Sequence, residues 1–115
     1  MNRIMSIHEY TLRRGVSAAQ FEEVVEKAKE RNLFNLPGLI EYHFLKRIRG
    51  TRQVAYATIW IYENMDAWAK LWGTVENPIK KEDYPEQWKS WENEILASLL
   101  TQDPDKIFYA AYEEF

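Results

Sequence analysis

The side chains best suited to acid–base chemistry near neutral pH are the two histidines, His8 and His43. His8 stands in the strand-like stretch IMSIHEY, and His43 follows Glu41 by two residues in LIEYHFLK. In a pocket, either histidine could act as a general base that removes a proton from an acidic phenol or enol. In the alternative interpretation, each one only lines a cavity and is hydrogen-bonded to Thr58, Glu41 or water. For a histidine taken alone, this second interpretation is favoured.

Other reaction chemistries find little support. The chain has no cysteine, which excludes disulfides and thiolate catalysis. It has no Gly-rich phosphate loop, nucleophile elbow or paired-carboxylate motif. His8, His43 and Glu41 could supply a site of two histidines and one carboxylate, but no compact spacing favours a metal. We therefore expect neither a metal nor another cofactor.

The composition is that of an ordinary globular chain of 115 residues, with 46% apolar and 29% charged residues. This length predicts one domain over residues 1–115. The net charge of -3 and the short basic cluster KRIRGTR (46–52) favour a solvated hairpin end over a nucleic-acid-binding face. No signal-peptide core or bilayer-length apolar run is present, and the lack of cysteine fits a reducing compartment. We expect a cytoplasmic protein without nucleic-acid or membrane partners.

Local patterns predict a strand, a helix, two strands, two helices and a last strand. Ser17 and Gln20 form a capping box at the first helix. The late helix carries an apolar stripe of Trp88, Trp91, Ile95 and Leu99. No role is predicted for residues 73–84. The predicted ranges are 3–13, a helix from Ser17, a hairpin of 39–49 with 52–62, a helix over 64–72, a helix from Pro85, and a strand over 106–112.

The hairpin determines which side chains share a face of the sheet. A two-residue Gly50-Thr51 loop places His43 opposite Thr58 and Glu41 opposite Trp60. One face is then nearly all apolar and is expected to carry the helices: Ile40, Tyr42, Phe44, Ile48, Ala55, Ala57, Ile59 and Ile61. The other is aromatic, partly polar and uncovered: Leu39, Glu41, His43, Leu45, Val54, Tyr56, Thr58, Trp60 and Tyr62. Such a face needs a cover, and a second copy of the chain is the simplest one.

These elements predict an α+β, ferredoxin-like βαββαβ fold. It has a four-stranded antiparallel sheet with helices on one face, and two copies are expected to dimerise into an α/β barrel. The chain is rich in aromatic residues, with 5 Trp, 7 Tyr and 5 Phe. Aromatic surface of this extent is typical of a pocket or a subunit contact.

Three stretches carry a resemblance to a known superfamily: EYTLRRGVSAAQFEE, ATIWIYENMDAW and PEQWKSW. They resemble the dimeric α/β-barrel superfamily, which includes the antibiotic-biosynthesis-monooxygenase-like, heme-degrading monooxygenase and NIPSNAP-like families. The resemblance extends over nearly the whole chain. It implies the fold and the homodimer. It also implies that cofactor-free oxygenation or cyclisation of an acidic phenol or enol is a suitable activity.

The heme-degrading branch of this superfamily gives a test at the level of residues. It uses an Asn on the first strand, a Trp at the end of the third strand and a His ligand on the following helix. His8 and Tyr62 match the first two positions, which implies that both face the barrel interior. The helix over 65–72 contains no His, so heme is not expected.

The sequence therefore predicts a pocket inside the barrel, with His8 and His43 as candidate catalytic residues. Strand alternation directs Ser6 and Tyr10 the same way as His8. The expected function is cofactor-independent monooxygenation, or binding, of a small aromatic or polyketide-like molecule. The alternative is a non-catalytic homodimer whose barrel is filled by its own side chains. The predicted ligand-binding residues are Tyr10, Glu41, Tyr56, Thr58, Trp60 and Tyr62.

Overall fold

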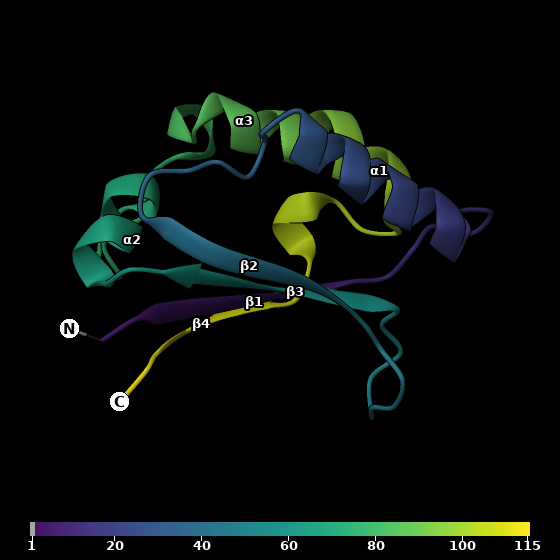
Figure 1. Ribbon diagram of the computed structural model, residues 1–115, viewed down its shortest axis with the longest axis horizontal. Coiled ribbons are helices and arrows are strands. Elements are labelled where there is room, and N and C mark those ends of the chain that lie inside the picture. The colour runs from purple at the N-terminus through teal and green to yellow at the C-terminus, as the bar shows by residue number, and fades with distance from the viewer. Residues whose placement is uncertain (1) are drawn as a thin grey trace.

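Four antiparallel strands form one sheet in the computed structural model, which describes residues 2–115. Their order across the sheet is β2-β3-β1-β4, and the helices cover one face (Figure 1). This is the predicted ferredoxin-like α+β fold, with the predicted order of main elements. The strands are β1 (Ile4–Tyr10), β2 (Leu39–Lys46), β3 (Tyr56–Tyr62) and β4 (Tyr109–Glu113).

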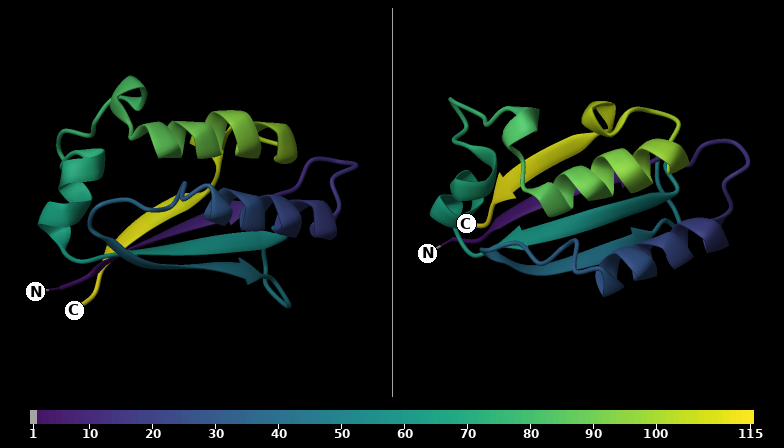
Figure 2. Two further views of the ribbon diagram at one scale, coloured as in Figure 1. Left: turned by 45° about the horizontal axis from the view of Figure 1, so that its top comes forward. Right: turned by 90° about the horizontal axis from the view of Figure 1, so that it is seen from above.

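Two long helices run side by side across the sheet, and a short one lies at its end (Figure 2). The first long helix is α1 (Ala18–Glu30), and α2 (Met65–Trp72) is the short one. The second long helix continues from α3 (Glu86–Lys89) through a π-helical segment, η2 (Ser90–Leu96), into α4 (Ala97–Leu99). Two 3-10 turns, η1 (Lys81–Asp83) and η3 (Pro104–Lys106), precede and follow that helix. Within residues 2–115, no helix has the length and apolar character needed to cross a membrane.

The predicted capping box begins α1. The Ser17 hydroxyl accepts a hydrogen bond from the Gln20 backbone N–H at 3.1 Å, and the Gln20 side-chain oxygen accepts one from the Ser17 N–H at 2.8 Å. Both bonds satisfy donors that a helix start otherwise leaves free. The helix then buries Phe21, Val25 and Ala28 against the sheet.

Trp60, in the middle of β3, is the centre of the core and is fully buried. Its ring lies 5.0 Å from the Trp88 ring and 5.2 Å from the Phe34 ring, both in edge-on geometry. Tyr42 and Phe44 of β2 pack on it from the same face of the sheet. Edge-to-face contacts of this kind add to the stabilisation from burial alone.

The predicted strand register is wrong by one residue. β3 pairs Thr58 with Phe44 and Trp60 with Tyr42, and the connection spans residues 47–55, where the Arg47 N–H donates to the Ala55 carbonyl. The longer loop shifts the pairing by one residue, so that the side chains of one strand point to the opposite face of the sheet from the one predicted. The β2 residues Tyr42 and Phe44 face the helices as predicted. The faces of β3 are reversed: Tyr56, Thr58, Trp60 and Tyr62 pack toward the helices, and Ala57, Ile59 and Ile61 lie on the open face.

The apolar stripe of the late helix also differs from the prediction. Trp88 and Trp91 are buried as expected, but Leu96 and Leu100 follow them in the core instead of Ile95 and Leu99, which are only partly buried. The cause is η2, because a π-helix has more residues per turn than an α-helix. The additional residue moves the stripe forward by one position. The other predicted helix-facing residues, Ile40 and Ile48, are 54% and 99% exposed, at a strand bulge and in the loop.

Gly73 ends α2 with a φ of 83°, and the segment 74–84 follows it. A Cβ atom there would lie 2.5 Å from the Ile79 nitrogen and 2.6 Å from the Asn77 oxygen. Gly15 also has a positive φ, of 91°, but open space surrounds its missing Cβ. An alanine at Gly15 would therefore introduce backbone strain alone, whereas an alanine at Gly73 would add a steric clash.

We predict that Gly73→Ala lowers the free energy of unfolding by at least about 3 kcal/mol, because rigid backbone atoms must move. Gly15→Ala should cost only about 1 kcal/mol, the cost of the strained φ. Urea unfolding followed by circular dichroism measures both. Equal losses for the two variants would contradict the packing of segment 74–84 against α2.

Candidate functional site

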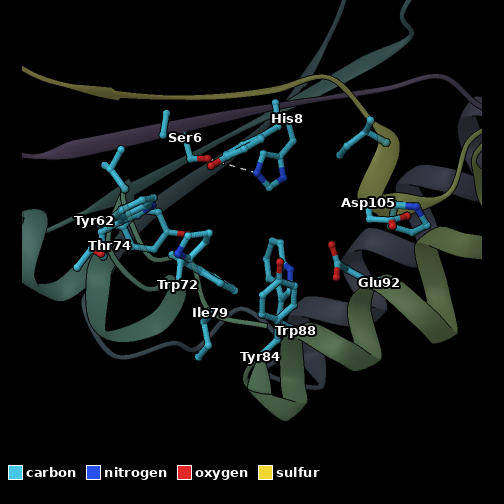
Figure 3. Close-up of a pocket in the computed structure, with 17 residues that line it drawn as sticks. Ser6, His8, Tyr62, Trp72, Thr74, Ile79, Tyr84, Trp88, Glu92 and Asp105 are labelled. Carbon is cyan, nitrogen blue, oxygen red and sulfur yellow. Dashed lines mark hydrogen bonds between the residues drawn. The ribbon is translucent and has the colours of Figure 1, made fainter. Parts of the chain in front are cut away.

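A pocket of about 610 Å³ lies on the helix side of the sheet (Figure 3). β1, β3 and β4 form its floor, α2 and segment 74–84 form one wall, and the long helix and η3 form the other. Its lining is rich in large rings and also carries the polar side chains of Ser6, His8, Thr74, Glu92 and Asp105. The rings belong to His8, Tyr62, Trp68, Trp72, Tyr84, Trp88 and Tyr109.

His8 projects from β1 into this pocket (Figure 3). Its ring lies 5.5 Å from the Tyr109 ring, 5.9 Å from the Trp88 ring and 6.0 Å from the Trp60 ring. Nε2 is 3.3 Å from the hydroxyl of Ser6, which is two residues earlier and on the same face. Burial among these rings lowers the pKa of His8 to about 4, so its imidazole is neutral at pH 7.

Glu92 brings a carboxyl group to the same pocket from η2. Burial raises the pKa of this carboxyl, and the Trp88 side chain and the charge of Lys81 only partly offset that effect. The Lys81 ammonium itself forms an ion pair at 3.1 Å with Asp105, another residue of the pocket lining, and this pair joins η1 to η3. His8 and Glu92 thus both shift toward their neutral forms.

The segment 74–84, for which no role was predicted from the sequence, lies along the pocket. Thr74, Val75, Pro78, Ile79 and Tyr84 all line the pocket. The Ile79 N–H donates to the Trp72 carbonyl at 2.9 Å, which holds the segment against the end of α2. The Tyr84 and Trp72 rings meet edge-on at 5.4 Å. The segment is therefore a wall of the pocket.

Only part of the predicted site meets at this pocket. His8 and Tyr62 line it, and Trp60 lies behind the His8 ring. Burial raises the pKa of Tyr62, so its hydroxyl keeps its proton. However, the prediction that His8 and Tyr62 face a barrel interior is wrong, because both lie on the side of the sheet that the helices cover.

Tyr10, Thr58 and Tyr56 are core residues on this same face. The Thr58 hydroxyl donates to the Tyr10 hydroxyl at 3.1 Å, and the Tyr56 hydroxyl donates to Glu22 of α1. None of the three lines the pocket of His8. Their predicted ligand-binding role stays a prediction that the geometry does not favour.

Glu41 and His43 lie on the opposite, open face of the sheet. The predicted meeting of His43 and His8 in one pocket is therefore wrong. The His43 Nε2 and a Glu41 carboxylate oxygen are 2.5 Å apart, and both side chains are about half exposed. The same separation rules out the metal triad considered from the sequence. Residues 2–115 contain no group of three His, Asp or Glu side chains that could hold a metal ion.

Sequence reasoning missed most of the walls of the pocket. Trp88 was predicted only as part of the apolar stripe of the late helix, and Ser6 only as sharing the face of His8. Trp72, Tyr84, Glu92 and Tyr109 were not assigned to a site. One signal for Glu92 was available. It stands four residues after Trp88, which places a carboxylate on the inward side of an apolar helix.

Comparisons with known proteins give a fold but no family. No family model and no curated protein matches the sequence. Several solved structures are similar at low identity. A dabb family protein with a ferredoxin-like fold from Mesorhizobium loti is 10% identical, with a TM-score of 0.62, over 100% of this chain and 97% of that one.

A dimeric ferredoxin-like protein of unknown function from Jannaschia sp. is 12% identical, with a TM-score of 0.64 over 97% of this chain and 99% of that one. SnoaB from Streptomyces nogalater, a cofactor-independent oxygenase, is 14% identical, with a TM-score of 0.62 over 100% and 95%. At these identities the similarity establishes the ferredoxin-like fold.

The neutral state of His8 predicts a specific pH dependence of stability. The unfolded histidine takes up a proton near pH 6.5 and the folded one only near pH 4, so the unfolded state binds more protons between these values. Lowering the pH from 7 to 4 should therefore cost the native protein up to about 3 kcal/mol through His8 alone. Above pH 7 this contribution vanishes.

Urea unfolding of the native protein and of His8→Asn at each pH isolates this contribution, since the acidic residues are common to both. The variant should gain stability relative to the native protein as the pH falls from 6.5 to 4. Parallel stability curves would show that His8 is not buried in its neutral form.

Proposed function

We propose that this protein is a homodimer that binds a small, flat aromatic molecule carrying an acidic hydroxyl group, with residues 1–115 acting as one domain. The observation that carries the proposal is the neutral imidazole of His8, set among aromatic rings in a pocket of about 610 Å³. This volume lies within the usual range of small-molecule sites, which are mostly apolar with a few placed polar groups.

The rings around His8 favour a planar ligand. Trp88 and Tyr109 both stand edge-on to the imidazole, with centroids within 6 Å. A flat molecule that enters beside them would exchange water for aromatic contacts, which are worth more than their buried area alone. Tyr62, Trp72 and Tyr84 extend the same apolar wall.

His8 supplies the polar contact. Its neutral ring can accept a hydrogen bond from a phenol or enol, and one nitrogen is already close to the Ser6 hydroxyl. A proton that moves from the ligand to the ring would create an imidazolium next to a phenolate. The opposite charges would then raise the pKa of His8 in the complex. Binding therefore favours ligands with acidic hydroxyl groups.

A second candidate function is cofactor-independent oxygenation. A neutral His8 base and a fold shared with the cofactor-independent oxygenase SnoaB favour it. A deprotonated, electron-rich ring can give electrons to O₂: one oxygen atom replaces a ring hydrogen as a carbonyl, and the other leaves as water with the two hydrogens that the phenol loses. The ring is thereby oxidised to a quinone, so the substrate supplies all the electrons and no other reductant is needed. Oxygen uptake that depends on the protein and is lost in His8→Leu would support this function over simple binding.

The open face of the sheet supports the proposed homodimer. No helix covers that face among residues 2–115, and the helices lie on the other side (Figure 1). Its centre is aliphatic, and Leu45 and Tyr112 at its borders are 47% and 57% exposed. We commit to a second copy of this chain as the cover, because the similar structures include dimeric ferredoxin-like proteins. The central residues are Met5, Ile7, Ala57, Ile59, Ile61 and Ala110.

In this dimer the open faces would form the barrel interior and fill it with aliphatic side chains. The alternative function, a non-catalytic dimer, would then leave the pocket on the helix side without a ligand. Ligand binding decides between the two functions.

We predict that 2-naphthol binds in the pocket and quenches tryptophan fluorescence, because Trp88 and Trp72 line the site. His8→Leu should weaken binding about tenfold, the value of one hydrogen bond in a buried site. His43→Leu is the matched control, since it removes the same side chain from the opposite face, and it should leave the affinity unchanged.

The methyl ether of the probe, 2-methoxynaphthalene, tests the hydroxyl group itself. It cannot donate to His8, so its affinity should be the same for the native protein and for His8→Leu. Absence of 2-naphthol binding, or equal effects of the two histidine variants, would contradict the proposed function.

The dimer prediction concerns the aliphatic face. Light scattering should give twice the 13.8 kDa chain mass. Ile59→Glu should shift the mass toward one chain, because it would bury an unpaired charge at the centre of the contact. Met65→Glu, on α2 and 38% exposed, is the control and should stay dimeric. A folded monomer of the native protein at micromolar concentration would contradict the dimer.

A further inference from the structure

Glu92 lines the pocket, and sequence reasoning assigned it no role. Figure 3 shows its side chain beside Trp88, on the side toward Asp105, with its carboxyl end directed toward the sheet. It comes from the long helix, whereas His8 comes from the sheet, so the two groups approach a ligand from different walls. The pocket therefore offers a ligand polar contacts on two sides.

The backbone of this helix sets the position of Glu92. Within the π-helical segment η2, Trp91 and Leu96 remain fully in the core while Glu92 lines the pocket beside Trp88. π-Helical segments are rare and are frequently found at functional sites. Here the wider turn places one carboxyl group at the pocket without removing an apolar side chain from the core.

The surroundings of Glu92 include no cation paired with it. The acidic and basic groups near it are Lys81 of η1, Asp105 of η3, and Tyr84 before the helix. Lys81 pairs with Asp105, and no Lys, Arg or His among residues 2–115 forms an ion pair with Glu92. His8, across the pocket on β1, is neutral and does not compensate a charge. Partial burial disfavours the charged form of Glu92, and a ligand that expels water would disfavour it further.

We propose that Glu92 is a ligand-binding residue that donates a hydrogen bond from a protonated carboxyl group to a carbonyl oxygen of the aromatic ligand. This inference rests on the proposed function and narrows its ligand class. The preferred molecule is a flat aromatic with an acidic hydroxyl for His8 and a ketone or similar acceptor for Glu92. Burial, which raises the pKa of Glu92, supports the protonated form.

The test compares two probes, 6-acetyl-2-naphthol and 2-naphthol, by fluorescence titration of the intact protein between pH 5 and pH 7. In this range His8 stays largely neutral, because its pKa is about 4. The native protein should prefer the acetyl probe by up to about tenfold when the Glu92 carboxyl is fully protonated, which is the contribution of one hydrogen bond in a buried site. Because burial raises the pKa of Glu92, the preference should be larger at pH 5 than at pH 7.

Three variants separate this role from a structural one. Glu92→Leu should abolish the preference for the acetyl probe and keep the affinity for 2-naphthol. Glu92→Gln keeps a donor that does not titrate, so its preference should persist without a pH dependence. Glu94→Gln is the control. Glu94 is an exposed neighbour in η2 that lies 3.8 Å from Arg31, and its removal should leave the native pattern unchanged.

The outcomes distinguish this inference from the function on which it rests. If 2-naphthol binds and depends on His8, but the acetyl preference is absent or is unchanged in Glu92→Leu, then the role of Glu92 is wrong and the proposed function stands. If neither probe binds, both are contradicted. A preference that varies with pH to the same extent in Glu92→Gln would also overturn the role of Glu92.

Discussion

The packing of Trp60 against the helices is the contact on which the rest of the structure depends. Its indole is fully buried between Phe34 of the loop after α1 and Trp88 of the long helix. Because side chains alternate along a strand, this one orientation also directs Thr58 and Tyr62 toward the helices. It leaves Ile59 and Ile61 on the open face. The pocket and the aliphatic surface are therefore two consequences of the same arrangement.

Burial has the same effect on the charge of two titratable groups of the pocket, His8 on the sheet and Glu92 on the long helix. It lowers the pKa of His8 and raises that of Glu92, so each group is shifted toward its neutral form. Neutral polar groups among aromatic rings suit an uncharged aromatic ligand with hydrogen-bonding groups. They suit a strongly charged ligand poorly, because its desolvation would not be repaid by an ion pair. The open face carries its own pair, Glu41 with His43, and that pair is exposed to solvent.

The sequence alone predicted the elements, their order and the fold class, because these depend on local signals. The capping box at Ser17 is an example. It did not predict the faces of β3, because these depend on the length of the loop over 47–55, and the Gly50-Thr51 signal favoured a shorter one. In the first strand, Glu9 lies on the open face and is paired with Arg52 at 2.9 Å.

Only two residues of the floor of the candidate site, His8 and Tyr62, were predicted. The walls were missed because they depend on irregular backbone. A π-helical segment is not visible in an apolar pattern of period 3.6, and the predicted stripe therefore continued through Ile95 and Leu99. The wall over 73–84 has no regular pattern at all. Its position depends on Gly73 and on the contact of Tyr84 with Trp72, which are tertiary features.

A crystal structure of the protein grown with 2-naphthol would locate the ligand relative to the two faces of the sheet. We expect the naphthalene ring between the sheet and the long helix, beside Trp88 and Tyr109, with its hydroxyl oxygen within hydrogen-bonding distance of a His8 ring nitrogen. A naphthol bound on the open face, near Glu41 and His43, with the helix-side pocket free of ligand, would contradict the proposed function.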